Sequence, residues 1–229
     1  MEITANKINN RKSLAVTAYE KIIRKIISLE YNPGQRLEEN QLVERLGIGR
    51  TPIREALLRL VGEKMVESHP NKGVIVRPIT LQNTKSVFEG MKILELGVAG
   101  LAVRQDATIL LSKMEASNQK VESAVKSMDV FGLVEANHDF HMYFADCSHN
   151  EYLVRAVNDV RSEAKRLSYL SYANEIDPER SLQIHYESVI REHDEITKYL
   201  LERNETKLKQ TIEKHIRTFQ QRIILYMTS

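Results

Sequence analysis

The sequence predicts a mainly α-helical protein, with an N-terminal winged helix-turn-helix domain and a C-terminal all-α helical bundle. Three observations support this fold class. A short helical pattern ends at Gly47, and a second begins near Gly49. Two short apolar runs with a glycine between them then predict a hairpin. From residue 80 onward the pattern is helical throughout, and no glycine follows Gly132.

The composition is that of an ordinary globular protein. The 229 residues are 42% hydrophobic and 28% charged, which is enough apolar material for one large or two modest cores. No run of about 18 apolar residues exists, and the N-terminus lacks the apolar core of a signal peptide. We therefore expect a cytoplasmic protein without a membrane partner. The single cysteine, Cys147, excludes an internal disulfide and a cysteine-rich metal site.

The charges are divided unevenly along the chain. Residues 1–80 hold 14 Lys and Arg against 9 Asp and Glu, a net charge of +5. Residues 81–229 hold 19 against 22, a net charge of −3. The basic part contains the helix-turn-helix, so the division favours a polyanionic partner for that part.

The chain begins with a polar segment, residues 1–12, that we expect to be a flexible arm. A helix is predicted over residues 13–29, where apolar side chains recur at helical spacing, and Asn32-Pro33-Gly34 follows as a turn. Its apolar stripe consists of Tyr19, Ile22, Ile23, Ile26 and Ile27.

The helix-turn-helix comes next. A helix over residues 39–46 is expected to end at Gly47 in a left-handed conformation. Pro52 fits the first turn of the following helix, because its missing N–H would have no intrahelical partner there. The apolar stripe of this second helix consists of Ile53, Ala56, Leu57, Leu60 and Val61.

Arg50, Thr51 and Arg54 lie off that stripe, at the start of the second helix. A cationic helix tip of this kind can enter the major groove of DNA N-terminus first. The alternative is a solvated charged face, which is the common state of helix charges, but the helix-turn-helix context favours contact with DNA. These three residues are the first predicted DNA-binding residues.

A hairpin over Met65 to Ser68 and Val74 to Arg77 would complete a winged domain spanning residues 13–78. Its tip carries Lys72 and Gly73, which we predict to contact a phosphate or the minor groove. Gly73 is equally compatible with a plain turn.

A second domain, residues 79–229, is predicted to combine effector binding with dimerisation. Thr80 is the expected cap of its first helix. No fixed repeat period is present, which favours a compact bundle. Six helices are predicted: 80–104, 107–128, 130–148, 150–173, 178–202 and 204–227.

Three histidines and an asparagine of this domain form a candidate metal site. Asn137 and His141 are four residues apart and share a helix face, whereas His193 and His215 lie among apolar neighbours in the last two helices. Three imidazoles and an oxygen ligand would suit a divalent ion such as Zn, Ni or Mn. The alternative is that each histidine is a hydrogen-bonded structural residue at the edge of the core.

Several motifs of residues 13–78 resemble the winged helix-turn-helix of the GntR family of bacterial transcription regulators. Their order and spacing match over the whole domain. The motifs are Asn32-Pro33-Gly34-Gln35-Arg36-Leu37, Leu42-Val43-Glu44-Arg45-Leu46-Gly47 and Arg50-Thr51-Pro52-Ile53-Arg54-Glu55-Ala56-Leu57. Residues 80–229 look like the family's FadR-type all-helical effector domain, called FCD, in its shorter VanR-like variant.

The resemblance implies roles for individual residues. It implies that Arg50 and Arg54 contact bases or phosphates, that Thr51 contacts the backbone and that Gly73 approaches the minor groove. It also implies a metal held by four groups, which match Asn137, His141, His193 and His215 here.

This chain departs from the family pattern at three positions. The family usually has Asp where Asn137 stands, and an amide brings no negative charge, so weaker metal binding is expected. Gly49 stands where a capping Ser is usual, and Met91 where an Arg often precedes Leu94-Glu95.

The resulting hypothesis is a homodimeric transcription regulator that binds a palindromic double-stranded operator. A small organic acid would control it by binding the metal, helped by Arg166. Two alternatives remain at this point. One is a metal-dependent hydrolase or oxygenase, against which stands the lack of a carboxylate at ligand spacing from the histidines. The other is an architectural DNA-binding protein whose bundle is inert.

Overall fold

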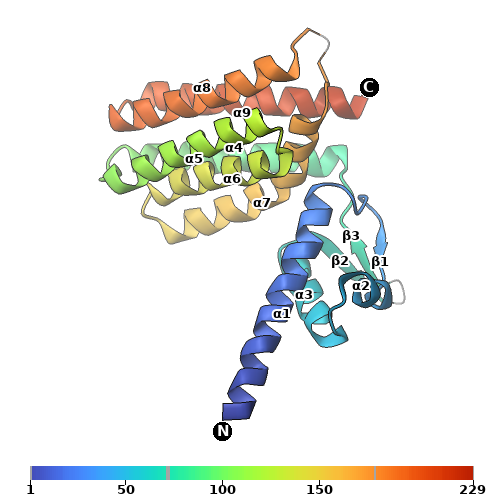
Figure 1. Cartoon of the computed structure of the whole chain (residues 1–229). Helices are drawn as coiled ribbons and strands as arrows, with labels where there is room; N and C mark the ends of the chain where they lie inside the picture. The colour runs from blue at the N-terminus through green and yellow to red at the C-terminus, as the bar shows by residue number, and fades with distance from the viewer. Residues whose placement is uncertain (1, 71–72, 178, 229) are drawn as a thin grey trace. The chain divides into compact units, whose positions relative to one another are not determined.

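The computed structural model describes residues 2–70, 73–177 and 179–228 (Figure 1). The described chain divides into two compact units, one that ends at Ile79 and one that begins at Thr80. The described parts are mostly helical, with one small sheet, so the predicted fold class is confirmed. Among the described residues, no helix is long and apolar enough to cross a membrane.

The first unit is a helix-turn-helix joined to a three-stranded antiparallel sheet. Its elements are α1 (Glu2–Ile27), β1 (Arg36–Leu37), α2 (Glu39–Leu46), α3 (Arg50–Gly62), β2 (Val66–His69) and β3 (Gly73–Val76). The strand order is β1-β3-β2. In the wing, Val66 pairs with Val76 and His69 with Gly73, whereas Leu37 of β1 pairs with Val74. The sheet therefore ties the segment before α2 to the wing.

Two local features of this unit differ from the sequence analysis. Residues 1–12 were expected to be a flexible arm, but α1 already begins at Glu2, in a stretch with no glycine or proline to interrupt a helix. A hairpin was predicted for the wing, and β1 adds a third strand to it that was not predicted. A two-residue strand shows no detectable alternation, so the sequence pattern cannot reveal it.

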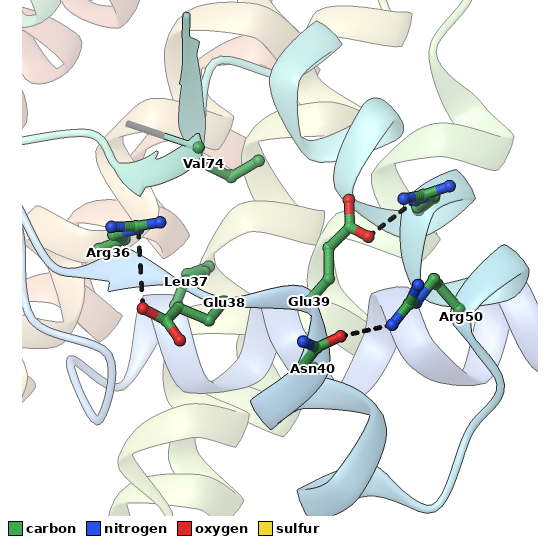
Figure 2. A pocket seen from close by; sticks show the side chains of 9 residues that line it. Arg36, Leu37, Glu38, Glu39, Asn40, Arg50 and Val74 are labelled. Carbon is green, nitrogen blue, oxygen red and sulfur yellow. Dashed lines mark hydrogen bonds and ion pairs between the residues drawn. The ribbon is translucent and has the colours of Figure 1, made fainter. Parts of the chain in front are cut away.

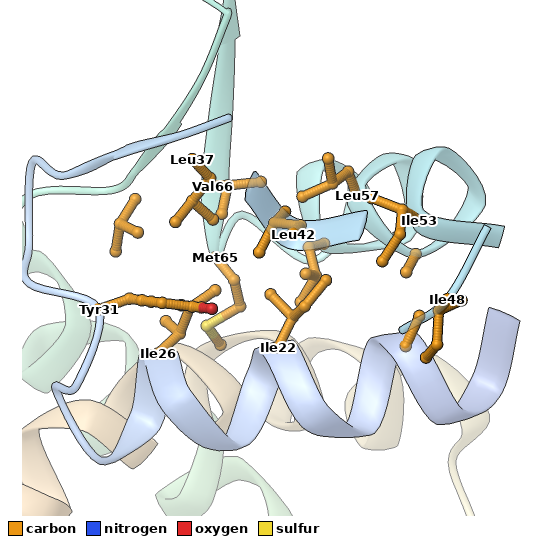
Figure 3. Packing of buried hydrophobic residues seen from close by; sticks show 14 residues of the cluster. Ile22, Ile26, Tyr31, Leu37, Leu42, Ile48, Ile53, Leu57, Met65 and Val66 are labelled. Carbon is orange, nitrogen blue, oxygen red and sulfur yellow. The ribbon is translucent and has the colours of Figure 1, made fainter. Parts of the chain in front are cut away.

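The core of the first unit lies between α1, the helix-turn-helix and the sheet (Figure 3). Ile22 and Ile26 of α1 point into this cluster from one side, and Ile53 and Leu57 of α3 point into it from the other; all four are at most 3% exposed. The stripes seen in the sequence are thus the buried faces. Burial of each such side chain stabilises the fold by about 1.5–3 kcal/mol and fixes α3 on the body of the unit.

The described part of the second unit consists of helices, several of which begin at a side-chain cap. Its elements are α4 (Leu81–Ala102), α5 (Thr108–Ser127), α6 (Val130–Asp146), α7 (Glu151–Ala173), α8 (Leu182–Leu201) and α9 (Glu205–Thr228). The Thr80 side chain accepts a hydrogen bond from the Asn83 N–H, as predicted, and Ser181 caps α8 in the same way. Helix α8 was expected from residue 178 and begins at Leu182, because the cap at Ser181 defines its start.

We predict that Gly47→Ala destabilises the first unit. Gly47 ends α2 with φ +65, in the left-handed region, and a new Cβ would meet nothing within 4 Å. The cost is therefore backbone strain of about 1–2 kcal/mol. Urea unfolding of the full chain, followed by circular dichroism, measures it.

Gly62→Ala is the matched control. Gly62 ends α3 inside a right-handed helix, also with open space around it. The same methyl group should stabilise the unit there by about 0.5 kcal/mol. Equal effects of the two substitutions would contradict the assignment of strain to Gly47.

Candidate functional site

The helix-turn-helix places one cationic edge of α3 against the start of α2. Gly47 is left-handed and Gly49 extended, so the chain reverses within three residues between the two helices. Pro52 and Ile53 are buried, which leaves Arg50, Thr51 and Arg54 exposed on the opposite side of the first turns. The structure thus exposes all three residues that the sequence marked on this helix.

Both arginines are held by side chains at the start of α2 (Figure 2). Arg50 Nη2 donates to Asn40 Oδ1 at 2.7 Å, and Arg54 Nε donates to Glu39 Oε2 at 2.7 Å. The second bond uses only Nε, so it leaves the two terminal NH2 groups of Arg54 for a ligand. Because the bonds restrict long flexible side chains, they lower the entropy that each arginine would lose on binding.

The wing borders the same groove. Arg36, Gly73 and Val74 line it together with the two arginines and the start of α2, around a volume of about 370 Å³. Gly73 has φ +76, and a Cβ there would lie 3.6 Å from Arg36 Nε. That distance is an ordinary van der Waals contact, so a side chain at this position would be disfavoured by the left-handed backbone and not by its neighbours. Lys72, the other predicted wing residue, lies outside the described residues.

This groove can receive a polyanion. Arg36 and Arg54 each expose 58% of their side chains, and the start of α3 has no side-chain cap, because its cap residue is Gly49. The first N–H groups of α3 are therefore available to an anion. A planar guanidinium matches the O6 and N7 acceptors of guanine in the major groove. The geometry suits duplex DNA.

In the second unit, three histidines from three helices meet in the interior. His141 of α6, His193 of α8 and His215 of α9 are 1%, 0% and 6% exposed. One ring nitrogen from each lies within 4.8 Å of the other two. His193 also stacks on Phe140, with ring centroids 3.9 Å apart. The three histidines that the sequence marked as candidates are therefore together.

Two of these histidines place Nδ1 beside a fixed oxygen, to which the Nδ1–H donates a hydrogen bond. His193 Nδ1 lies 3.0 Å from Asn118 Oδ1, and the amide nitrogen of Asn118 donates to the Ile190 carbonyl and to Asp194 Oδ1. His215 Nδ1 lies 2.9 Å from Glu192 Oε2. With Nδ1 as the donor, the Nε2 of each ring keeps a lone pair, which is the form that binds metals.

The third histidine has a different partner. His141 Nδ1 lies 2.8 Å from Arg161 Nη2, and Arg161 Nε donates to Glu95 Oε1. Arg161 and Glu95 are 3% and 1% exposed, so this is a buried ion pair beside the histidines. The sequence analysis missed Arg161, Asn118 and Glu192, because no spacing rule connects residues on different helices.

The residues present fit a divalent first-row metal ion. Imidazole nitrogens are ligands that such ions prefer, and three histidines with room for a further group match many metal sites. Within the described chain, the buried Nε2 atoms of His141 and His193 have no hydrogen-bond partner. A buried polar nitrogen left unpaired costs free energy, which an ion would recover.

Asn137 lines a small cavity beside the histidines. Its Oδ1 accepts a hydrogen bond from the Tyr172 hydroxyl at 3.2 Å. The cavity measures about 10 Å³, roughly the space of one water molecule. Its lining residues include Asn137, Arg161, Tyr172, His185, Glu192 and His215. Arg166, predicted to bind the effector, is buried on the same helix as Arg161 but is not among the lining residues.

Burial controls the ionisation of this cluster. Desolvation lowers the pKa of His141 and His193 well below the usual value, and the neighbouring charge of Arg161 acts in the same direction. Burial alone would raise the pKa of Glu192, but its hydrogen bond with His215 and the charge of Lys214 lower it. Two neutral imidazoles and an anionic acceptor therefore coexist in the interior near pH 7.

Comparison with known proteins identifies both units. Residues 14–76 match the family model of "Bacterial regulatory proteins, gntR family", and residues 86–218 match that of the FCD domain. The chain belongs to the GntR family. It is a GntR-family transcriptional regulator with an FCD domain, and its relatives are regulators rather than enzymes. The enzyme alternative raised by the three histidines is thereby removed.

Three curated relatives match this regulator over more than half of its length. It is 23% identical over 201 residues to the uncharacterized HTH-type transcriptional regulator YdhC of Bacillus subtilis, covering 86% of this chain and 85% of that one. It is 24% identical to the Nta operon transcriptional regulator of Aminobacter aminovorans, over 82% and 89% of the two chains. It is 29% identical over 157 residues to LutR of Bacillus subtilis, over 58% and 67%.

Solved structures show the same fold. Escherichia coli McbR/YncC superposes with a TM-score of 0.76 at 20% identity, covering 94% of this chain and 98% of that one. A putative GntR regulator from Rhodococcus sp. RHA1 superposes with a TM-score of 0.73 at 21% identity, covering 93% and 98%.

We predict that the second unit loses stability as the pH falls below about 6.5. Burial and the Arg222 charge lower the pKa of His185 to about 3, against about 6.5 when unfolded. Between these values the unfolded chain binds more protons, so this contribution is full above pH 6.5 and decreases toward pH 3. The urea midpoint should be lower at pH 5 than at pH 7. His185→Gln should show a smaller difference, and an unchanged difference would contradict the assignment.

Proposed function

We propose that this GntR-family regulator is a cytoplasmic homodimer that binds a palindromic operator and is controlled by a small organic acid. The acid would bind in the FCD domain beside a divalent metal ion. The observation that carries the effector part is the buried histidine cluster, with unpaired Nε2 atoms on His141 and His193 and with His215 lining a small cavity.

The DNA-binding step follows from the groove on the first unit. Two copies related by a twofold axis would place two α3 helices in successive major grooves of a palindromic site. Arg50 and Arg54 would read guanine edges, Thr51 and Gly73 would contact the backbone or the minor groove, and Lys72 would add a phosphate contact. Counterion release from the phosphates would supply the part of the affinity that is independent of sequence.

The metal step assigns four groups of the second unit. His141, His193 and His215 would hold the ion, with Asn137 as a neutral oxygen ligand on the helix of His141. When bound, a divalent ion supplies a positive centre that attracts a carboxylate. Asn118 and Glu192 would orient the imidazoles of His193 and His215 through Nδ1.

The effector step requires the second unit to change shape. A cavity of about 10 Å³ admits no organic acid, so side chains from α6, α7, α8 and α9 must move when one binds. A ligand that prefers the rearranged form shifts the population toward it and can change the separation of the two DNA-reading helices in a dimer.

The alternative of an architectural protein with an inert bundle accounts poorly for the same residues. An inert core gains nothing from histidines whose inner nitrogens are unpaired, because apolar side chains of similar size would avoid that cost. In the described part of the bundle, unpaired buried atoms occur on His141, His185, His193, Glu95 and Arg222.

We predict that Arg54→Ala weakens operator binding by about 1–3 kcal/mol and relaxes specificity at one base position. The operator would first be selected from a pool of random duplexes, and affinities then measured by fluorescence anisotropy at fixed salt. Arg45→Ala is the matched control, because Arg45 is exposed on α2 outside the groove. The Arg45→Ala variant should change the affinity for all DNA sequences by the same factor. If Arg54→Ala keeps the wild-type ratio between its affinities for the operator and for other sequences, Arg54 does not read a base.

We predict that the purified protein binds about one zinc ion per chain and that His193→Ala abolishes this binding. Elemental analysis after dialysis gives the stoichiometry. His149→Ala is the matched control, because His149 is exposed and outside the cluster. A protein that takes up no zinc, nickel or manganese would defeat the proposed metal site.

A further inference from the structure

The three clustered histidines are not equivalent in their hydrogen bonds. The amide of Asn118 has a fixed orientation, because its nitrogen donates to two acceptors on α8, so its oxygen must face His193 Nδ1. Glu192 accepts from His215 Nδ1. Both histidines therefore carry their hydrogen on Nδ1 and turn a bare Nε2 to the interior.

His141 carries its hydrogen on the other nitrogen. A guanidinium has donors and no acceptor, so Arg161 Nη2 at 2.8 Å requires His141 Nδ1 to accept. A neutral His141 ring then keeps its hydrogen on Nε2. As it stands, the cluster presents two lone pairs and one N–H, which is one lone pair short of a three-histidine metal site.

Glu95 offers His141 Nδ1 an acceptor that would leave Nε2 without its hydrogen. Glu95 Oε2 is buried, has no hydrogen-bond partner in the described chain, and lies 3.4 Å from His141 Nδ1. Arg161 Nε donates to Glu95 Oε1, and Arg161 Nη2 lies 2.5 Å from the same oxygen. One carboxylate oxygen thus holds the arginine, and the other stands next to the histidine nitrogen without a bond.

We infer that metal binding exchanges the partner of His141 Nδ1 from Arg161 to Glu95, and that this exchange releases one N–H of Arg161 Nη2 to bind the carboxylate of the effector. The inference rests on the proposed function and deepens it. The hydrogen leaves Nε2, where the ion takes its place, and one hydrogen is gained by Nδ1, which donates it to Glu95 Oε2. The ring is neutral before and after.

Arg161 is placed to use the released N–H. Its side chain lines the small cavity with Asn137 and His215, and it is 3% exposed. A buried guanidinium N–H that has lost one acceptor favours an anion, because a charge-assisted hydrogen bond is strong in a low-dielectric interior. Metal and carboxylate should therefore bind cooperatively, each raising the affinity of the other by the same factor.

The first test reads the hydrogen position directly. Long-range proton–nitrogen spectra of ¹⁵N-histidine-labelled full-length protein distinguish the two neutral forms, and the signal missing in His141→Gln assigns His141. We expect the hydrogen on Nε2 in the metal-free protein and on Nδ1 after zinc is added. A metal-free protein with the hydrogen on Nδ1 would overturn the inference.

The second test measures zinc affinity by competition with a chromophoric chelator, in sodium acetate and in sodium chloride of equal ionic strength, corrected for zinc binding by acetate itself. In wild type, acetate should tighten zinc binding by about 5–150-fold. Glu95→Gln keeps an acceptor for Arg161 but cannot also accept from His141, so zinc binding should weaken about 10–100-fold.

Two further variants separate the causes. Glu192→Gln is the control carboxylate, because an amide oxygen still accepts from His215 and Ser188 lies beside its nitrogen, so it should weaken zinc binding less than Glu95→Gln. Arg161→Lys keeps a charge opposite Glu95 but loses the planar fork, so zinc binding should persist while the acetate effect shrinks.

These experiments distinguish a failure of the partner exchange from a failure of the proposed metal site. Wild-type zinc affinity in Glu95→Gln, or a full acetate effect in Arg161→Lys, overturns the partner exchange while leaving the metal site intact. Failure of the wild type to bind zinc in any buffer overturns the metal site and this inference together.

Discussion

The hydrogen bonds to the outer nitrogens of the three buried histidines are the constraint on which the second unit depends. Each bond comes from a different place: Asn118 on α5, Glu192 on α8, and Arg161 on α7 with Glu95 on α4. Because these groups are buried, leaving any one unpaired would cost more than an ordinary surface contact contributes. The histidines therefore connect helices along the whole bundle, and a change at one ring can be transmitted to several of them.

Hydrogen bonds also orient functional side chains at the surface of the first unit, where each bond contributes less free energy than in the buried cluster. Arg50 and Arg54 are fixed by Asn40 and Glu39, so the cationic edge of α3 is preorganised by its neighbour α2. The Arg54–Glu39 pair is exposed and contributes little to stability. The pair instead orients the side chain, because Glu39 binds Nε of Arg54 and leaves its two terminal NH2 groups able to contact the edge of a base.

Most of the fold could be predicted from local sequence patterns. The features that these patterns missed depend on contacts between residues far apart in the sequence. Helical spacing located the helices, and Gly47 and Thr80 marked helix ends, because these signals act within a few residues. Strand β1 could not be foreseen, since it exists only by pairing with β3. Helical spacing also identified the three histidines as inward-facing, each on its own helix. Their partners Asn118 and Arg161 could not be identified in this way, because they lie on other helices, 75 and 20 residues from His193 and His141 in the sequence.

A charge inventory of the buried cluster explains why an anion suits it. Near neutral pH the rings of His141 and His193 are uncharged, and the charge of Arg161 balances that of Glu95. Glu192 then leaves one negative charge beside His215, which the half-exposed Lys214 partly offsets. Three imidazoles and the amide of Asn137 add no charge, so a divalent ion would turn this interior from negative to positive. A second buried anion would then compensate the excess, because uncompensated charge in a low-dielectric interior is costly. With an aspartate in place of Asn137 that charge would come from the protein itself. The amide instead leaves the compensation to a ligand, which makes metal occupancy and carboxylate binding dependent on each other.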